Sequence, residues 1–283
     1  MPNKKEYDMS SKLPFIPDIP DYGYIRQQMN EDLTYRLENR THRTSYGRPL
    51  YQRINVQLIM TQECPYHCPF CMERQHPMTG NNDFESQQKA LLDVLSEHPN
   101  ARLTITGGEP GLYPEHVKAL SGIYKEHSNN VFMSVNTAGY DQSLQQYGHI
   151  NLSVNQYVKP DLSLFKGFTY QTVLQDDEMT ADNIKRIMDE NKRYTTQFSL
   201  RFLSSLKKHD YPVQIFHELK SDNDIKVHTF RIGDFFTYVT FDYKDCHARI
   251  ALGDMYQQTH NDYQDGYSNL IIHPNGDIRP NWT

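Results

Sequence analysis

The chain has 283 residues, of which 23% are charged, 37% hydrophobic and 12% aromatic, and its formal net charge is -6. This length suits one α/β domain or two smaller ones, and the apolar content is too high for a disordered chain. Like charges do not gather in long runs, which argues against a basic nucleic-acid surface and against a polybasic membrane patch.

Residues 1–50 are predicted to form an irregular arm, with prolines at positions 14, 17 and 20. The first residues show no apolar core and no small-residue cleavage site, so a signal peptide is not expected. No run approaches the roughly 18 apolar residues of a membrane span. We therefore expect a cytoplasmic protein without membrane contact, in which clustered cysteines bind metal more often than they form disulfides.

From about residue 51 the chain alternates between strand and helix patterns. Strand patterns cover 53–60, 101–106, 130–136, 150–155, 197–203 and 225–232, and helix patterns cover 84–98, 114–127, 180–193 and 211–220. Six strands separated mostly by helices predict a parallel sheet with right-handed crossovers. This order favours an α/β fold built as a curved, partial (β/α)6 barrel, similar to a TIM barrel, over a doubly wound sheet. For the stretch 156–178, a substrate loop and an irregular loop both stay open.

The chain divides into three predicted segments: the N-terminal arm at 1–50, the partial barrel at 51–235 and a β-rich C-terminal extension at 236–283. The extension contains a strand pattern at 238–245 and a β-hairpin expected to turn at Asn275-Gly276. In such barrels the chemistry lies at the C-terminal ends of the strands. A cysteine-rich loop and several polar segments follow the predicted strands, so we expect them to share that end.

Three of the four cysteines, Cys64, Cys68 and Cys71, lie in the loop directly after the first predicted strand. Three thiolates on one short loop can bind three irons of a [4Fe–4S] cube and leave the fourth iron open to a small molecule. The alternative is a zinc site completed by His67 or His76, which would make the chain a zinc-binding interaction module. Zinc sites usually show two separated ligand pairs, so the single triplet favours the cluster.

This loop, with Phe70 just before its last cysteine, resembles that of the radical S-adenosylmethionine (radical SAM) enzymes. The segment "GGEP" after the second predicted strand matches a second motif of that family, and the resemblance covers about residues 52–235 in element order. It implies that the three cysteines hold a [4Fe–4S] cluster whose open iron binds S-adenosylmethionine (SAM). It also implies that the GGEP segment contacts the amino group of SAM, through Gly107, Gly108, Glu109 and Pro110.

The resemblance implies further SAM contacts near the ends of the later strands, where an ordinary polar strand-end residue is the alternative at each position. Asn136, Ser153 and Asn155 match places that bind the ribose or the methionine carboxylate. Arg201 would pair with that carboxylate, and Ile232 in "FRIGD" would lie near the adenine.

Cys246 is the one cysteine outside the loop, and an auxiliary cluster would need three or four. It is either a buried structural thiol, a ligand, or a hydrogen-atom donor. The last role resembles that of the single extra cysteine in radical SAM epimerases, and it would make an epimerisation or another redox-neutral rearrangement the expected reaction.

The family resemblance implies an oxygen-sensitive enzyme that cleaves SAM to a 5′-deoxyadenosyl radical and abstracts hydrogen from a substrate. We expect a small polar metabolite or natural-product intermediate, with a peptide or a nucleotide as the alternative. The acidic balance argues against nucleic acid. The need for an electron implies a donor such as a flavodoxin or ferredoxin.

Overall fold

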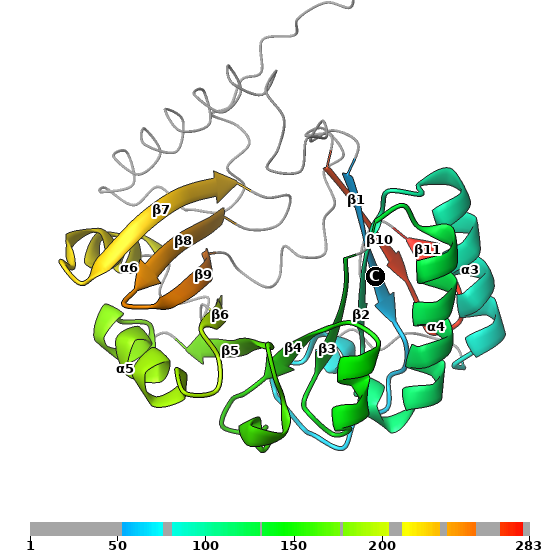
Figure 1. Ribbon diagram of the computed structural model, residues 1–283, viewed down its shortest axis with the longest axis horizontal. Coiled ribbons are helices and arrows are strands. Elements are labelled where there is room, and N and C mark those ends of the chain that lie inside the picture. The colour runs from blue at the N-terminus through cyan, green and yellow to red at the C-terminus, as the bar shows by residue number, and fades with distance from the viewer. Residues whose placement is uncertain are drawn as a thin grey trace, which may run out of the picture.

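The computed structural model describes residues 53–75, 81–130, 132–175, 178–203, 211–232, 237–252 and 267–279. The predicted arm at 1–50 lies outside these ranges. The described chain forms a curved sheet with helices on its outer side (Figure 1), which confirms the predicted α/β partial barrel. No helix among the described residues is long and apolar enough to cross a membrane.

The strands are β1 (Arg53–Ile59), β2 (Arg102–Thr106), β3 (Met133–Thr137), β4 (His149–Ser153), β5 (Thr169–Gln175), β6 (Gln197–Leu203), β7 (Ile225–Ile232), β8 (Thr237–Tyr243), β9 (Cys246–Leu252), β10 (Tyr267–Ile272) and β11 (Ile278–Arg279). The α-helices are α2 (Met72–Gln75), α3 (Phe84–Glu97), α4 (Pro114–His127), α5 (Ala181–Asn191) and α6 (Tyr211–Ser221). Three short 3-10 helices follow strands: η3 (Pro110–Leu112), η4 (Gln142–Gln146) and η5 (Leu162–Leu164).

The described strands make one sheet in the order β11-β10-β1-β2-β3-β4-β5-β6-β9-β8-β7. All neighbours from β10 through β9 are parallel, whereas β11, β8 and β7 pair antiparallel with their neighbours. Because the parallel strands share a direction, the loops that follow them gather at one edge of the sheet. We call this edge the C-terminal edge.

The structure corrects the prediction at several strands. The sixth predicted barrel strand, 225–232, is the outermost strand β7, and β9 takes the place beside β6 instead. The stretch 156–178 contains a strand, β5, between β4 and β6. The segment 236–283 supplies β9 and β8, which lie between β6 and the outermost β7, and also β10 and β11, which extend the sheet beyond β1. The hairpin at Asn275-Gly276 is confirmed between β10 and β11.

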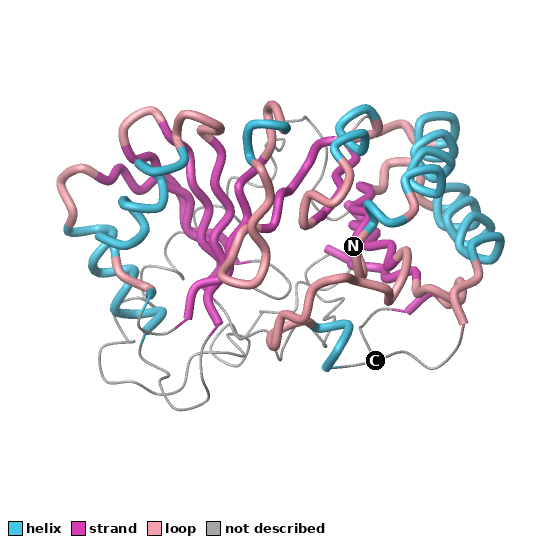
Figure 2. The backbone as a smooth tube through the Cα atoms, turned by 90° about the horizontal axis from the view of Figure 1, so that it is seen from below, coloured by secondary structure: helices cyan, strands magenta, loops and turns pink. Residues whose placement is uncertain are grey.

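Alternate residues of each strand face the outer helices and form the hydrophobic core. Leu103, Ile105, Val135, Leu152, Leu200 and Ile250 are almost fully buried there, together with helix residues such as Leu91, Val117, Leu120, Ile184 and Met188. Each such side chain contributes about 1.5–3 kcal/mol by leaving water. The remaining residues of the strands point to the inner, concave face of the sheet, and Figure 2 shows the strands lying inside the helices from a second direction.

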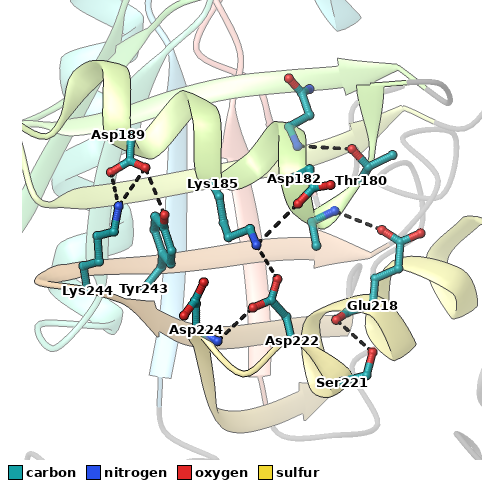
Figure 3. A network of polar contacts seen from close by, with 12 residues as sticks. Thr180, Asp182, Lys185, Asp189, Glu218, Ser221, Asp222, Asp224, Tyr243 and Lys244 are labelled. Carbon is teal, nitrogen blue, oxygen red and sulfur yellow. Dashed lines mark hydrogen bonds and ion pairs between the residues drawn. The ribbon is translucent and has the colours of Figure 1, made fainter.

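On the outer side, ion pairs join α5 to the turn after α6 and to the turn from β8 to β9 (Figure 3). Lys244 Nζ lies 2.7 and 2.8 Å from the two carboxylate oxygens of Asp189, and the Tyr243 hydroxyl donates to the same carboxylate at 2.9 Å. Lys185 bonds Asp222 at 2.6 Å. These contacts hold the start of β9 against α5.

Candidate functional site

The cysteine loop begins at the C-terminal end of β1 and is held against the end of β2 by backbone hydrogen bonds. Met60 N donates to Thr106 O at 2.9 Å, Gly108 N to Thr61 O at 2.6 Å, and Glu109 N to Glu63 O at 2.8 Å. The pairing of β1 with β2 thus continues past both strands, and it fixes the chain up to the residue before Cys64.

Gly107 and Gly108 are required by this close contact. Gly107 has a φ of +120°, and a Cβ there would lie 2.7 Å from Thr61 O. A Cβ on Gly108 would lie 2.0 Å from Glu63 O. Side chains at these positions would therefore collide with the backbone that carries the cysteine loop. The glycines serve the approach of two protein segments, whereas the sequence suggested only an approach to SAM.

Glu109 points into the protein and is fully buried. Its carboxylate accepts hydrogen bonds from Gly111 N at 2.7 Å, from Ala138 N at 2.7 Å and from the Thr137 hydroxyl. Burial raises the pKa of Glu109, while these three hydrogen bonds lower it. Glu109 thus joins the ends of β2 and β3, and Pro110 starts η3 directly after it.

A buried glutamine supports the loop from below. The Gln87 side chain, on α3, donates to Ile59 O at 2.9 Å, Met60 O at 3.1 Å and His273 O at 3.3 Å. One amide therefore joins the C-terminal ends of β1 and β10 at the point where the cysteine loop leaves the sheet. Gln87 was not predicted from the sequence, although a glutamine among the buried leucines of α3 was a signal for it.

Cys64, Cys68 and Cys71 are all free and half-buried. Burial raises the pKa of Cys64 and of Cys68, and the neighbouring thiols of the triplet add to both increases. Thiols in this setting need nearby positive charge to be held as thiolates, which iron ions supply. The donor set therefore fits a [4Fe–4S] cluster.

The described residues do not favour the zinc alternative. Among them, no three His, Cys, Asp or Glu side chains converge closely enough to bind a single metal ion. One zinc ion requires such convergence, whereas each cysteine of a cluster binds a different iron. His76 lies outside the described residues.

The loop after β4 lies against the cysteine loop. Asn155 Oδ1 accepts hydrogen bonds from Tyr157 N at 2.8 Å and Val158 N at 3.1 Å. The Asn155 side chain lies close enough to Cys68 to lower the pKa of its thiol, against the larger effect of burial. The ring of Phe70 meets the ring of Tyr157 edge to face, with 6.0 Å between centroids. The structure therefore brings Phe70 and Asn155 together beside the cysteines.

Two carboxyl groups border the cysteines. Glu63 accepts a hydrogen bond of 2.6 Å from the Tyr113 hydroxyl at the start of α4. Glu73, two residues after Cys71, is buried, and burial raises its pKa to about 8. It is therefore largely protonated at neutral pH. Neither residue was predicted from the sequence.

The inner face below this loop is lined with hydrogen-bonded polar side chains. Asn136 donates to the Thr106 hydroxyl at 3.4 Å and accepts from Asn151 at 2.8 Å. Further pairs join neighbouring strands: Thr104 with Ser134, His149 with Thr169, Ser199 with Arg249, and His228 and His247 with Asp242. Of these residues, only Asn136 was predicted from the sequence to contact SAM. The signal for the rest was the alternation of polar with apolar residues along each strand.

The other predicted SAM residues lie at different distances from the loop. Ser153 ends β4 and faces the inner side in register with Gln171. Arg201 is half-buried on the inner face of β6, in register with Ala251 of β9. Ile232 ends β7, which is separated from β6 by two strands. The predicted place of Ile232 near the adenine stays a prediction.

Cys246 does not face the site. It is the first residue of β9, so it lies at the edge of the sheet opposite the cysteine loop. Its side chain is only 2% exposed and belongs to the hydrophobic core with Ala248 and Ile250, on the helix-covered side. Its neighbour His247 points inward instead. The hydrogen-donor role predicted for Cys246 is therefore corrected: the residue is a buried core thiol in this structure.

A model of the radical SAM superfamily matches residues 58–219 of the chain. No curated protein matches it. Among solved structures, SuiB from Streptococcus suis bound to its precursor peptide SuiA has 14% identity and a TM-score of 0.50, covering 94% of this chain and 66% of SuiB. The likeness to SuiB shows a shared fold.

Two other solved structures were matched with lower scores. The structure of anSMEcpe with bound AdoMet has 18% identity and a TM-score of 0.43, covering 54% of this chain and 52% of that one. BtrN in complex with AdoMet and 2-DOIA has 13% identity and a TM-score of 0.38, covering 81% and 72%. The chain thus spans about half the length of anSMEcpe.

Proposed function

Because this chain belongs to the radical SAM superfamily, whose cofactors are a [4Fe–4S] cluster and SAM, we propose that it is an enzyme that removes hydrogen from a small polar metabolite. Cys64, Cys68 and Cys71 would hold the cluster. The observation that carries the proposal is the position of the cysteine loop. It lies at the C-terminal edge, fastened to the GGEP segment, next to an inner face covered with polar side chains.

When bound, the cluster and SAM supply a 5′-deoxyadenosyl radical that abstracts a hydrogen atom. The chain itself must bind and orient the reactants and keep water away. The backbone pairing at Gly108 and the buried Gln87 amide hold the cysteine loop in place. Phe70 and Tyr157 cover the loop on the side of β4, and the polar side chains of the inner face offer donors and acceptors to the substrate.

The fourth cysteine does not enter this proposal. A thiol on the helix-covered side of β9 cannot give a hydrogen atom to a substrate on the inner face, so an epimerisation through Cys246 is set aside. Rearrangement and oxidation remain within the proposed class. A flavodoxin or ferredoxin is the proposed source of the electron, and a peptide substrate is the alternative that the experiment must separate from a metabolite.

The test is anaerobic purification with iron and sulfide, followed by addition of SAM and dithionite. We expect a brown protein and 5′-deoxyadenosine above the level of a Cys68→Ala variant. Crude metabolite and peptide fractions are then added separately, and the proposal expects the metabolite fraction to increase 5′-deoxyadenosine formation. No 5′-deoxyadenosine from the wild-type protein would refute the enzyme class, and stimulation by the peptide fraction alone would refute the metabolite assignment.

A further inference from the structure

The inner face of the sheet carries positive charge although the whole chain has a net charge of -6. The described inward-facing strand positions include Arg102, Arg201, Lys226 and Arg249. Among the same described positions the one acid is Asp242. Asp242 is engaged by His247 Nδ1 at 2.7 Å and His228 Nε2 at 2.5 Å. The charge of this face thus opposes that of the protein.

Two of the arginines are neighbours on that face. Ser199 on β6 is in register with Arg249 on β9, and Arg201 is in register with Ala251. Arg201 and Arg249 are therefore diagonal neighbours on the same side of two adjacent strands. With strands about 4.8 Å apart and a rise of about 3.3 Å per residue, such neighbours lie about 8 Å apart at the backbone, so an anionic group a few ångströms wide can contact both. The Ser199 hydroxyl is buried and accepts a 3.0 Å hydrogen bond from Arg249 Nη2, which orients the guanidinium.

This pair is also at a useful distance from the cysteine loop. Ser153, Gln171, Ser199 and Arg249 form one row across four strands, and Ser153 lies two residues before Asn155, whose side chain is beside Cys68. Three strand spacings of about 4.8 Å put the Arg249 backbone roughly 14 Å from that of Ser153. The long arginine side chain covers part of this span, which leaves room for a small molecule.

We propose that Arg249, oriented by Ser199 and assisted by Arg201, binds a carboxylate or phosphate group of the substrate. This inference rests on the proposed function and narrows its substrate to an anionic metabolite, held by its charged end while its reacting carbon lies toward the cysteine loop. Arginine suits this task because its planar group binds carboxylate or phosphate with two parallel hydrogen bonds.

The experiment measures the binding of two probes, succinate and inorganic phosphate, to the reconstituted protein by calorimetry. SAM is present at saturation, so its own carboxylate is already bound. We expect Arg249→Gln to weaken probe binding at least tenfold, and Arg249→Lys to recover part of it, because lysine keeps the charge but not the planar fork. The matched control is Arg186→Gln on the exposed side of α5, which should bind as the wild type does. The better of the two probes identifies the anionic group.

Equal binding by Arg249→Gln and the wild type would overturn the inference. The titration is repeated without SAM. Probe binding that depends on Arg249 in the absence of SAM and disappears at saturating SAM would also overturn the inference, since Arg249 would then belong to the SAM site. The formation of 5′-deoxyadenosine by the wild-type protein is measured separately. If it fails while probe binding still depends on Arg249, the proposed function is refuted and the anion site stands.

Discussion

The contact between Gly108 and the cysteine loop gives the sharpest prediction, for the Gly108→Ala variant. The new Cβ would lie 2.0 Å from Glu63 O and 2.6 Å from Glu63 C. Both atoms belong to the backbone, so the loop itself must move. Overpacking typically costs about 1–3 kcal/mol, and the two backbone hydrogen bonds lost with it cost about 1 kcal/mol each.

We therefore expect Gly108→Ala to lower the free energy of unfolding by about 3–5 kcal/mol, equivalent to a fall in melting temperature of roughly 10 °C. Calorimetry of the metal-free protein measures the melting temperature. Iron analysis after reconstitution measures whether the cysteine loop still binds iron. The control is Gly122→Ala in α4, where a Cβ meets no atom within 4 Å. It should stabilise the helix by about 1 kcal/mol. A Gly108→Ala variant that melts and binds iron like the wild type would refute the reasoning.

Three further predictions concern buried or paired side chains. Glu109→Gln should lower the free energy of unfolding, measured in urea, by about 2–3 kcal/mol. The new NH2 group is a donor and would face Gly111 N or Ala138 N, which donate to the carboxylate in the wild type. An unchanged urea midpoint would contradict this. Hydrogen bonds from Lys244 and Tyr243 lower the pKa of Asp189 to about 2. The contribution of the ionised Asp189 to the stability of the folded protein is therefore complete above about pH 4 and disappears as the pH falls toward 2. The difference in melting temperature between the wild type and Asp189→Asn should shrink over that range, and a constant difference would count against the ion pair. Cys246→Ala should bind as much iron as the wild type, since Cys246 lies on the outer side, whereas Cys68→Ala should lose it; iron loss from both would show that Cys246 supports the cluster.

The fold was predictable where strand patterns are simple. Leu103 and Ile105 alternate with threonines in β2, and this two-residue period predicts a strand. The same period went unrecognised in β5 and β9, where polar residues hide it: Thr172 is buried in β5, and Cys246, Ala248 and Ile250 alternate with His247 and Arg249. Sequence order also placed β7 next to β6, because nothing local reveals that a later hairpin strand takes that position.

The sequence by itself determined the cysteine loop, the GGEP segment and their place after the first two strands, because these depend on residue types at short spacings. Only the tertiary structure decided the rest of the site. It showed that Gly107 and Gly108 press against the cysteine loop, and that Glu109 is used inside the protein. It also placed Cys246 on the outer, helix-covered face of the sheet, away from the proposed site, and Arg249 on the inner face. The physical reason is that a strand residue's side is fixed by register with its neighbours, and register is set by pairing between segments far apart in the chain.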